Sequence, residues 1–164
     1  MPIRAIVCDF GGVLTTPLHL SFKAVEEHTG IGLEPIGRAM QSAAEQRGEN
    51  PLFQLERGEL TEEQFLDLLA EFVEPEIGHR PSFDGFRDVY FDALDPNGPM
   101  IALMRSLREA QYRMALLTNN VREWASLWRS MLPVDEIFEL VVDSADVGMR
   151  KPDRGIYELT VERL

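Results

Sequence analysis

The chain has 164 residues, of which 45% are hydrophobic and 27% are charged, which suits one compact domain or a core domain with a smaller inserted one. Its 28 acidic and 16 basic residues give a net charge of -12, and such a surface repels nucleic-acid phosphates and anionic lipids. No apolar run reaches the roughly 18 residues that a membrane-spanning helix needs. The first residues show no secretory pattern. We therefore expect a cytoplasmic protein that binds neither nucleic acid nor membrane.

The single cysteine, Cys8, excludes an intrachain disulfide and a cysteine-rich zinc site, and its place in an apolar run predicts a buried side chain. The acidic balance also limits how the chain binds a phosphorylated molecule. Such a ligand is repelled everywhere except at a locally cationic pocket. Any phosphate site therefore needs its own lysine, helix N-terminus or metal ion.

Three short apolar runs predict the strands of a parallel sheet. Each run stops at polar residues, which is typical of buried strands whose carboxyl ends carry the functional groups. The runs are residues 3–8, 114–117 and 138–142, followed by Asp9, by Thr118, Asn119 and Asn120, and by Asp143 and Ser144 respectively. Strands alternating with helices predict a doubly wound, Rossmann-like α/β fold, with both faces of each strand buried.

About a hundred residues between the first two strands have helical patterns throughout. The expected helices are residues 20–28, 36–46, 61–72, 83–93 and 100–110. Thr61 and Gln64 form a capping-box pattern, which favours a structural role for the start of the third of these helices. The turn-forming cluster at residues 95–99 predicts a boundary. We interpret residues 1–15 and 96–164 as an α/β core and residues 16–95 as an inserted α-helical cap.

The segment after the second strand, residues 121–131, predicts a helix with one apolar face. Trp124, Leu127, Trp128 and Met131 share that face, and this spacing favours packing over an aromatic substrate box. Thr118, Asn119 and Asn120 precede it, where a hydroxyl, amides and helix N-terminal N–H groups suit either a phosphate or an ordinary N-cap.

Two further elements are candidates for an anion site, although neither is decisive alone and a lone loop lysine is usually solvated. Asp9 ends a buried strand and precedes Gly11 and Gly12, so it is either a turn residue or a group that a ligand approaches closely. Lys151 lies in a loop before Pro152 and Asp153, where proline ends a strand and the aspartate is expected to cap the next helix.

Together these segments resemble the first three motifs of the haloacid-dehalogenase-like (HAD) hydrolase superfamily. They are residues 9–14 (Asp-Phe-Gly-Gly-Val-Leu), 117–120 (Leu-Thr-Asn-Asn) and 151–153 (Lys-Pro-Asp). Residues 55–61 also resemble a segment of the helical cap in subfamily I. The most similar members are phosphatase-like proteins with an Asp-x-Gly-Gly or Asp-x-Gly-Asn first motif. They include sugar-phosphate phosphatases and domains joined to epoxide hydrolases or acyl-CoA dehydrogenases.

The resemblance implies a magnesium-dependent phosphatase of a small phosphorylated metabolite. Asp9 would attack phosphorus to form an aspartyl-phosphate, and Lys151 would neutralise the nucleophile and the substrate. Thr118, Asn119 and Asn120 would bind phosphoryl oxygens. Mg²⁺ would bind the Asp9 carboxylate and the Gly11 carbonyl oxygen.

The chain departs from the family pattern at Gly11. Most phosphatases of the superfamily carry a second aspartate two positions after the nucleophile, which acts as general acid and base. Without it, the chain would be slow, would need a good leaving group, or would borrow an acid such as His19 or a metal-bound water.

The end of the sequence is the second departure. The family's fourth, acidic motif follows a further strand, whereas this sequence stops in a helix that begins near Asp153, so we expect the C-terminal part of the core to be missing. Asp143 and Asp146 are the remaining candidate helpers for the metal, and we expect no well-ordered Mg²⁺. The first strand would then be an open edge, covered by a homo-oligomer partner or by the missing C-terminal segment.

Two alternative functions stay open. Gly11 and the absent fourth motif favour a weak or inactive phosphatase-like regulatory or interaction domain. A metal-free haloacid dehalogenase is the third reading, although such enzymes resemble one another in an Asp-x-Tyr-Gly-Thr first motif that this chain does not match.

Overall fold

The computed structural model describes residues 3–164, with three strands and a series of helices in chain order. The N-terminal half contains β1 (Ala5–Cys8), α1 (His19–Thr29), α2 (Leu33–Arg47), α3 (Pro51–Glu56), α4 (Glu62–Ile77) and α5 (Phe86–Asp92). The C-terminal half contains α6 (Gly98–Glu109), β2 (Arg113–Thr118), the 3-10 helix η1 (Arg122–Trp124), α7 (Ala125–Ser130), α8 (Val134–Ile137), β3 (Leu140–Asp143), α9 (Ser144–Val147) and α10 (Arg154–Arg163).

The strands form a parallel sheet in the order β1-β2-β3. The register pairs Cys8 with Leu116 and Thr118 with Asp143, so the carboxyl ends of all three strands lie at one edge of the sheet. This is the parallel α/β arrangement expected from the apolar runs and the polar residues after them. The sheet therefore brings together segments that are far apart in the sequence.

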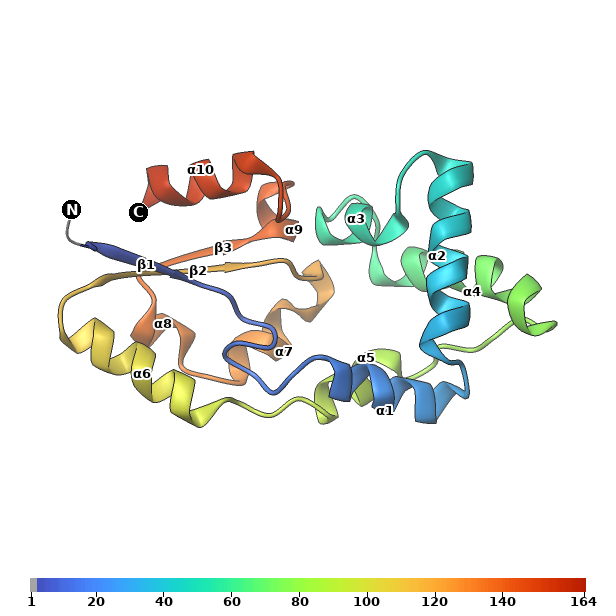
Figure 1. The fold of residues 1–164 in the computed structure, drawn as a ribbon, viewed down its shortest axis with the longest axis horizontal. Helices are drawn as coiled ribbons and strands as arrows, with labels where there is room; N and C mark the ends of the chain where they lie inside the picture. The colour runs from blue at the N-terminus through green and yellow to red at the C-terminus, as the bar shows by residue number, and fades with distance from the viewer. Residues whose placement is uncertain (1–2) are drawn as a thin grey trace.

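Helices cover the two faces of the sheet unequally. On one face, α6, α7 and α8 pack on the sheet around Trp128, Met104 and Ile137. On the other face, Ile156 of α10 packs against Leu117 and Val142. Figure 1 shows α10 on one side of the strands and α6 and α8 on the other. The helix on the second face therefore covers β2 and β3.

The prediction that every strand is buried on both faces was wrong for β1. Cys8 is buried as expected, but Val7 on the opposite face is 44% exposed. The cause is the place of β1 at the edge of the sheet, beyond the apolar contacts of α10. The strand is also shorter than residues 3–8, since it begins at Ala5.

Helices α2, α3 and α4 lie together, and the contacts pair α2 with α4 and α1 with α5. Figure 1 shows α2 and α4 far from α10, with α3 next to α9 at the carboxyl end of β3. The predicted capping box is confirmed at the start of α4, because Thr61 Oγ1 accepts from the Gln64 backbone N–H and Gln64 Oε1 accepts from the Thr61 backbone N–H. These two hydrogen bonds fix the N-terminus of α4 through residues of its own first turn.

The two chain segments that join these helices to the sheet run side by side. Thr15 forms an antiparallel bridge with Pro96, and the Thr16 N–H donates to the Asp95 carbonyl at 2.8 Å. The Asn97 N–H donates to the Leu14 carbonyl, also at 2.8 Å. This paired crossing coincides with the turn-forming cluster at residues 95–99.

Two local expectations need correction. Residues 121–131 were expected to form one helix, but they begin with the 3-10 turn η1, and α7 follows. Asp153 does stand at the N-cap of α10, although its side chain accepts no hydrogen bond from the first turn. No helix within residues 3–164 is both long and apolar enough to cross a membrane.

Candidate active site

Asp9 follows directly on β1, at the start of a tight turn. The N–H groups of Val13 and Leu14 donate to the Phe10 carbonyl at 3.2 and 2.8 Å, and Gly12 has a φ of 73°, which favours glycine. Phe10 itself is buried in the core beneath the sheet edge. The turn therefore presents the Asp9 carboxylate, whose side chain is 44% exposed, at the carboxyl edge of the sheet.

Lys151 lies against Asp9 although the two are far apart in sequence. Its Nζ is 2.6 Å from Asp9 Oδ1 and donates to the Leu117 carbonyl at 3.1 Å. The lysine side chain is 18% exposed, so its ammonium is largely removed from water next to a single carboxylate. In an acidic chain this is a local cation at the point where an anion would have to bind.

Asn119 fixes the Lys151 loop through two hydrogen bonds to the backbone of Lys151. Its Oδ1 accepts from the Lys151 N–H at 2.8 Å, and its Nδ2 donates to the Lys151 carbonyl at 3.0 Å. Both functional atoms of the Asn119 side chain are therefore engaged within the chain. A phosphate contact from this side chain stays a prediction, and the observed contacts make Asn119 a positioning residue.

Thr118 and Asn120 flank this clamp. The Thr118 hydroxyl is buried and donates to the Asn119 carbonyl at 3.3 Å, while the Asn120 N–H donates to Ser144 Oγ at 3.0 Å. Asn120 Oδ1 accepts from the Val121 N–H at 2.9 Å, which is a local turn contact. The predicted phosphate-binding residues thus lie beside the Asp9–Lys151 pair, and their phosphate-binding role stays a prediction.

Sequence reasoning did not single out Glu56 and Arg150. Glu56 Oε2 accepts from Arg150 Nε at 2.5 Å and from Asn119 Nδ2 at 3.2 Å, and both members of the ion pair are largely buried. The Arg150 guanidinium also lies over the Phe53 ring, 3.9 Å from its centre. Since Glu56 ends α3, one carboxylate of this helix joins the loop after β2 to the loop that carries Lys151.

A signal for this contact was present in the sequence. Glu56 falls within residues 55–61, the segment that resembles part of the helical cap of subfamily I, and Arg150 precedes Lys151. Neither position has a partner that spacing can identify, because their sequence separation is 94 residues. Only the folded chain shows the pair.

The oxygen donors available to a divalent cation are few. Asp9 supplies one carboxylate, and within residues 3–164 the Gly11 carbonyl receives no hydrogen bond from the protein. No group of three or more His, Cys, Asp or Glu side chains is arranged for a metal in this described part. One carboxylate and one free carbonyl match the smallest protein contribution with which Mg²⁺ is held, the rest being water and phosphate oxygens.

Asp143 is not available as a metal ligand in this arrangement. It is 3% exposed and its carboxylate caps α9 by accepting from the Ala145 N–H at 3.1 Å. Burial raises the pKa of Asp143 to about 6, and the nearby negative charge of Asp146 adds to the increase. Asp146 itself is exposed.

Cys8 and His19 contribute little to the site. Burial, reinforced by the Asp9 charge, raises the pKa of the Cys8 thiol to about 11, which favours an inert thiol. His19 is exposed at the start of α1 and does not line the hollow that contains Gly11. The position of His19 therefore gives no support to its expected role as a borrowed acid.

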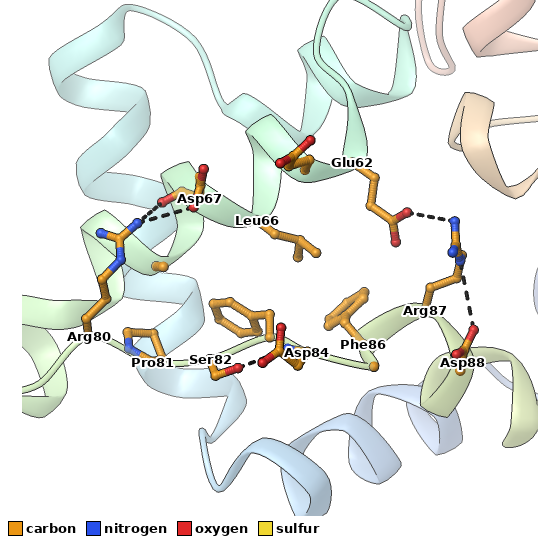
Figure 2. A pocket seen from close by; sticks show the side chains of 14 residues that line it. Glu62, Leu66, Asp67, Arg80, Pro81, Ser82, Asp84, Phe86, Arg87 and Asp88 are labelled. Carbon is orange, nitrogen blue, oxygen red and sulfur yellow. Dashed lines mark hydrogen bonds and ion pairs between the residues drawn. The ribbon is translucent and has the colours of Figure 1, made fainter.

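A polar hollow of about 520 Å³ lies away from these residues, between α4 and the segment before α5. Figure 2 shows its two arginines at opposite ends, Arg80 paired with Asp67 and Arg87 paired with Glu62, with Leu66 and Phe86 between them. The hollow contains none of the predicted site residues.

The whole described chain, residues 3–164, matches the family model of haloacid dehalogenase-like hydrolases. The chain belongs to this family. The resemblance inferred from the three motifs is thereby confirmed, together with the Rossmann-like fold class.

The chain is 24% identical over 176 residues to bifunctional epoxide hydrolase 2 of Mus musculus, and covers 100% of its own length but 31% of that relative. It is 28% identical over 167 residues to mouse acyl-CoA dehydrogenase family member 10, of which it covers 15%. The chain therefore spans less than a third of the length of these curated relatives.

Solved structures agree on the fold. A HAD family enzyme of Bacteroides thetaiotaomicron has a TM-score of 0.70 at 22% identity, with 99% of this chain and 79% of that one covered. The same enzyme has been solved with magnesium and inorganic phosphate, with a TM-score of 0.64 at 21% identity. An L-2-haloacid dehalogenase has a TM-score of 0.66 at 16% identity, with 99% of this chain and 73% of the dehalogenase chain covered. These identities show the fold, and hydrolases of more than one chemistry share it.

Proposed function

We propose that this chain is a phosphohydrolase that transfers the phosphoryl group of a small monoester to Asp9 and then to water. The observation that carries the proposal is the Lys151 ammonium 2.6 Å from the Asp9 carboxylate, in a chain with a net charge of -12. A phosphate dianion approaching a carboxylate needs such a cation. The solved relative with bound magnesium and phosphate supports the same reading.

In the first step Asp9 is the nucleophile. Oδ1 is occupied by Lys151 and by the Phe10 N–H at 2.7 Å, whereas Oδ2 receives no hydrogen bond within residues 3–164. An Asp9 oxygen forms a bond to phosphorus while the ester P–O bond breaks, and the alcohol oxygen leaves with the electron pair. Lys151 stabilises the negative charge on the transferring group.

In the second step water attacks phosphorus, the bond to Asp9 breaks, and inorganic phosphate leaves. The sum is one ester and one water consumed, one alcohol and one phosphate formed. Because position 11 is glycine, no side chain there protonates the leaving oxygen or deprotonates the water. Such proton transfers typically contribute about 10²- to 10⁴-fold in rate, so we expect slow turnover of alkyl phosphates.

The Asp9 carboxylate and the Gly11 carbonyl oxygen are the groups of this chain that would hold Mg²⁺. When bound, it supplies positive charge that lowers the repulsion between the carboxylate and the phosphoryl group. The chain's own contribution is the turn that orients Asp9 and the Asn119 clamp that holds Lys151 in place.

The test is phosphate release from aryl and alkyl monoesters with and without Mg²⁺, with Asp9→Asn as the control variant. Asp9→Asn keeps the size of the side chain and removes the nucleophile, so we expect no release and no acid-stable label from ³²P-substrate. Equal release by the wild type and Asp9→Asn would disprove the proposal.

Two other functions use the same residues. Gly11 supports a weak or inactive phosphatase-like domain that binds a phosphorylated partner, and in that case phosphate would bind without turnover. A dehalogenase would attack carbon through the same Asp9, and chloride release from 2-chloropropionate detects it. The Lys151–Asp9 pair suits the phosphatase best because the substrate there carries two negative charges next to the reacting atom.

A further inference from the structure

An apolar cavity begins at the candidate active site and extends among the helices of the cap. Its volume is about 280 Å³. One end is formed by Gly11, Thr118 and Asn119, and the Asn119 side chain is hydrogen-bonded to the Lys151 backbone. Asp9 and Lys151 themselves do not line the cavity but lie just beyond this end. Most of the remaining wall comes from α1 to α5, including Phe22 and Met40, and from Trp124 and Trp128. The cavity therefore has a polar end at the sheet edge and an apolar body beneath the cap.

The two carboxylates that line this cavity are already neutralised. Glu56 is paired with Arg150, as described above. Glu62 Oε1 accepts from Trp124 Nε1 at 2.9 Å, and Glu62 Oε2 accepts from Arg87 Nη1 at 3.1 Å. Neither acid is left to bind a hydroxyl-rich or cationic ligand without breaking these contacts.

Aromatic rings form one wall of the body. Tyr90 and Phe91 lie 5.1 and 5.3 Å from the Trp124 ring, measured between ring centres, and Phe86 lies 6.3 Å from it. Burial raises the pKa of Tyr90 to about 12, in agreement with a surrounding of low polarity. A ligand group that fills this space gains by leaving water, as apolar groups do.

We propose that the cavity holds the organic part of the substrate, and that the substrate is a phosphate monoester of a small apolar alcohol between butyl and hexyl, or benzyl, in size. This inference rests on the proposed function for its phosphate end. The size follows from the volume, since small-molecule pockets usually measure about 300–1,000 Å³ and this one lies at the lower limit. A sugar phosphate would place hydroxyl groups against an apolar wall and lose their hydrogen bonds to water.

The test measures binding separately from turnover. Methyl-, butyl-, hexyl- and octylphosphonate, which cannot be hydrolysed, are titrated into the chain with Mg²⁺ by calorimetry. We expect the Kd to fall about threefold to fourfold for each added methylene up to hexyl, the ratio given by burying one methylene, and then to level off. 2,3-Dihydroxypropylphosphonate should bind more weakly than propylphosphonate.

Two matched variants locate the effect. Met40→Gln keeps the length of the side chain and places an amide in the cavity, so hexylphosphonate should bind at least about fivefold more weakly while methylphosphonate is unaffected. Met100→Gln, which makes the same change in α6 outside the cavity, should alter neither. Leu66→Gln introduces the amide from α4 instead of α2 and repeats the test if Met40→Gln does not fold.

The outcomes separate this inference from the proposed function. A Kd that is independent of chain length, with hexyl and glyceryl phosphates hydrolysed equally well, overturns the apolar-substrate inference and leaves the phosphohydrolase standing. A chain-length gradient without any phosphate release supports the apolar site and overturns the phosphohydrolase. No binding of any phosphonate overturns both.

Discussion

Lys151 gives the sharpest test of the site because the chain has only two lysines, Lys23 and Lys151. Lys151→Gln removes the ammonium but keeps an amide N–H that can donate to the buried Leu117 carbonyl. Lys23→Gln makes the same change in net charge at a position that is 70% exposed and 3.7 Å from Glu27. The two variants therefore differ in the place of the lost charge alone.

The expected magnitudes follow from exposure. The Asp9 side chain is 44% exposed, so the Lys151–Asp9 pair is partly screened by water and its loss should lower the free energy of unfolding by about 1 kcal/mol or less. Catalysis should suffer far more. A cationic donor aimed at developing charge is worth about 10²- to 10³-fold in rate, so we expect kcat/KM of Lys151→Gln to fall by that factor.

The assay combines phosphate release under kcat/KM conditions with urea unfolding of the same preparations. Lys23→Gln should resemble the wild type in both. The reasoning is refuted if Lys151→Gln retains more than about a third of wild-type kcat/KM, a loss below 1 kcal/mol, or if its loss of rate is matched by Lys23→Gln.

Three further predictions concern single positions. Gly11→Asp should raise the turnover of alkyl phosphates by about 10²-fold or more, and that of aryl phosphates less. A Cβ at position 11 would lie 3.1 Å from Leu18 Cδ1, so the Leu18 side chain must shift. Gly11→Asn is the control, because it adds a side chain of the same size without an acid. Burial raises the pKa of Asp143 from 3.8 to about 6. The folded state therefore favours the protonated form, and its stabilising contribution is complete below pH 3.8 and is lost as the pH rises through about 6. In urea unfolding, the free energy of unfolding of Asp143→Asn should rise relative to that of the wild type by up to about 3 kcal/mol between pH 4 and 7.5. A difference between the two proteins that does not change with pH would contradict this. Cys8, with a pKa of about 11, should react with a thiol reagent at pH 8 about 100-fold more slowly in the folded chain than in urea, and equal rates would contradict its burial.

The sequence allowed the sheet to be predicted because its strands are short apolar runs that stop at polar residues. That pattern located β2 and β3 to within two residues at each end and put Asp9, Thr118 and the segment after Val142 at one edge. The place of Lys151 beside Asp9 was expected only from the family resemblance. The pattern failed for the exposed face of β1, because an apolar run does not reveal whether its strand is central or at an edge. The edge position of β1, which was expected from the family resemblance and the absent further strands, is confirmed for residues 3–164. The pattern also failed for η1, since the choice between 3-10 and α-helical turns depends on contacts that periodicity does not contain.

The contacts that hold the site together were beyond prediction for a different reason. The Asn119 clamp on Lys151 uses backbone atoms, which have no sequence signature, and Glu56 and Arg150 are 94 residues apart, so no spacing rule pairs them. Asn119 Nδ2 donates both to Glu56 Oε2 and to the Lys151 carbonyl, so one side chain joins α3, the loop after β2 and the Lys151 loop. The Glu56–Arg150 ion pair is a second link between α3 and the Lys151 loop.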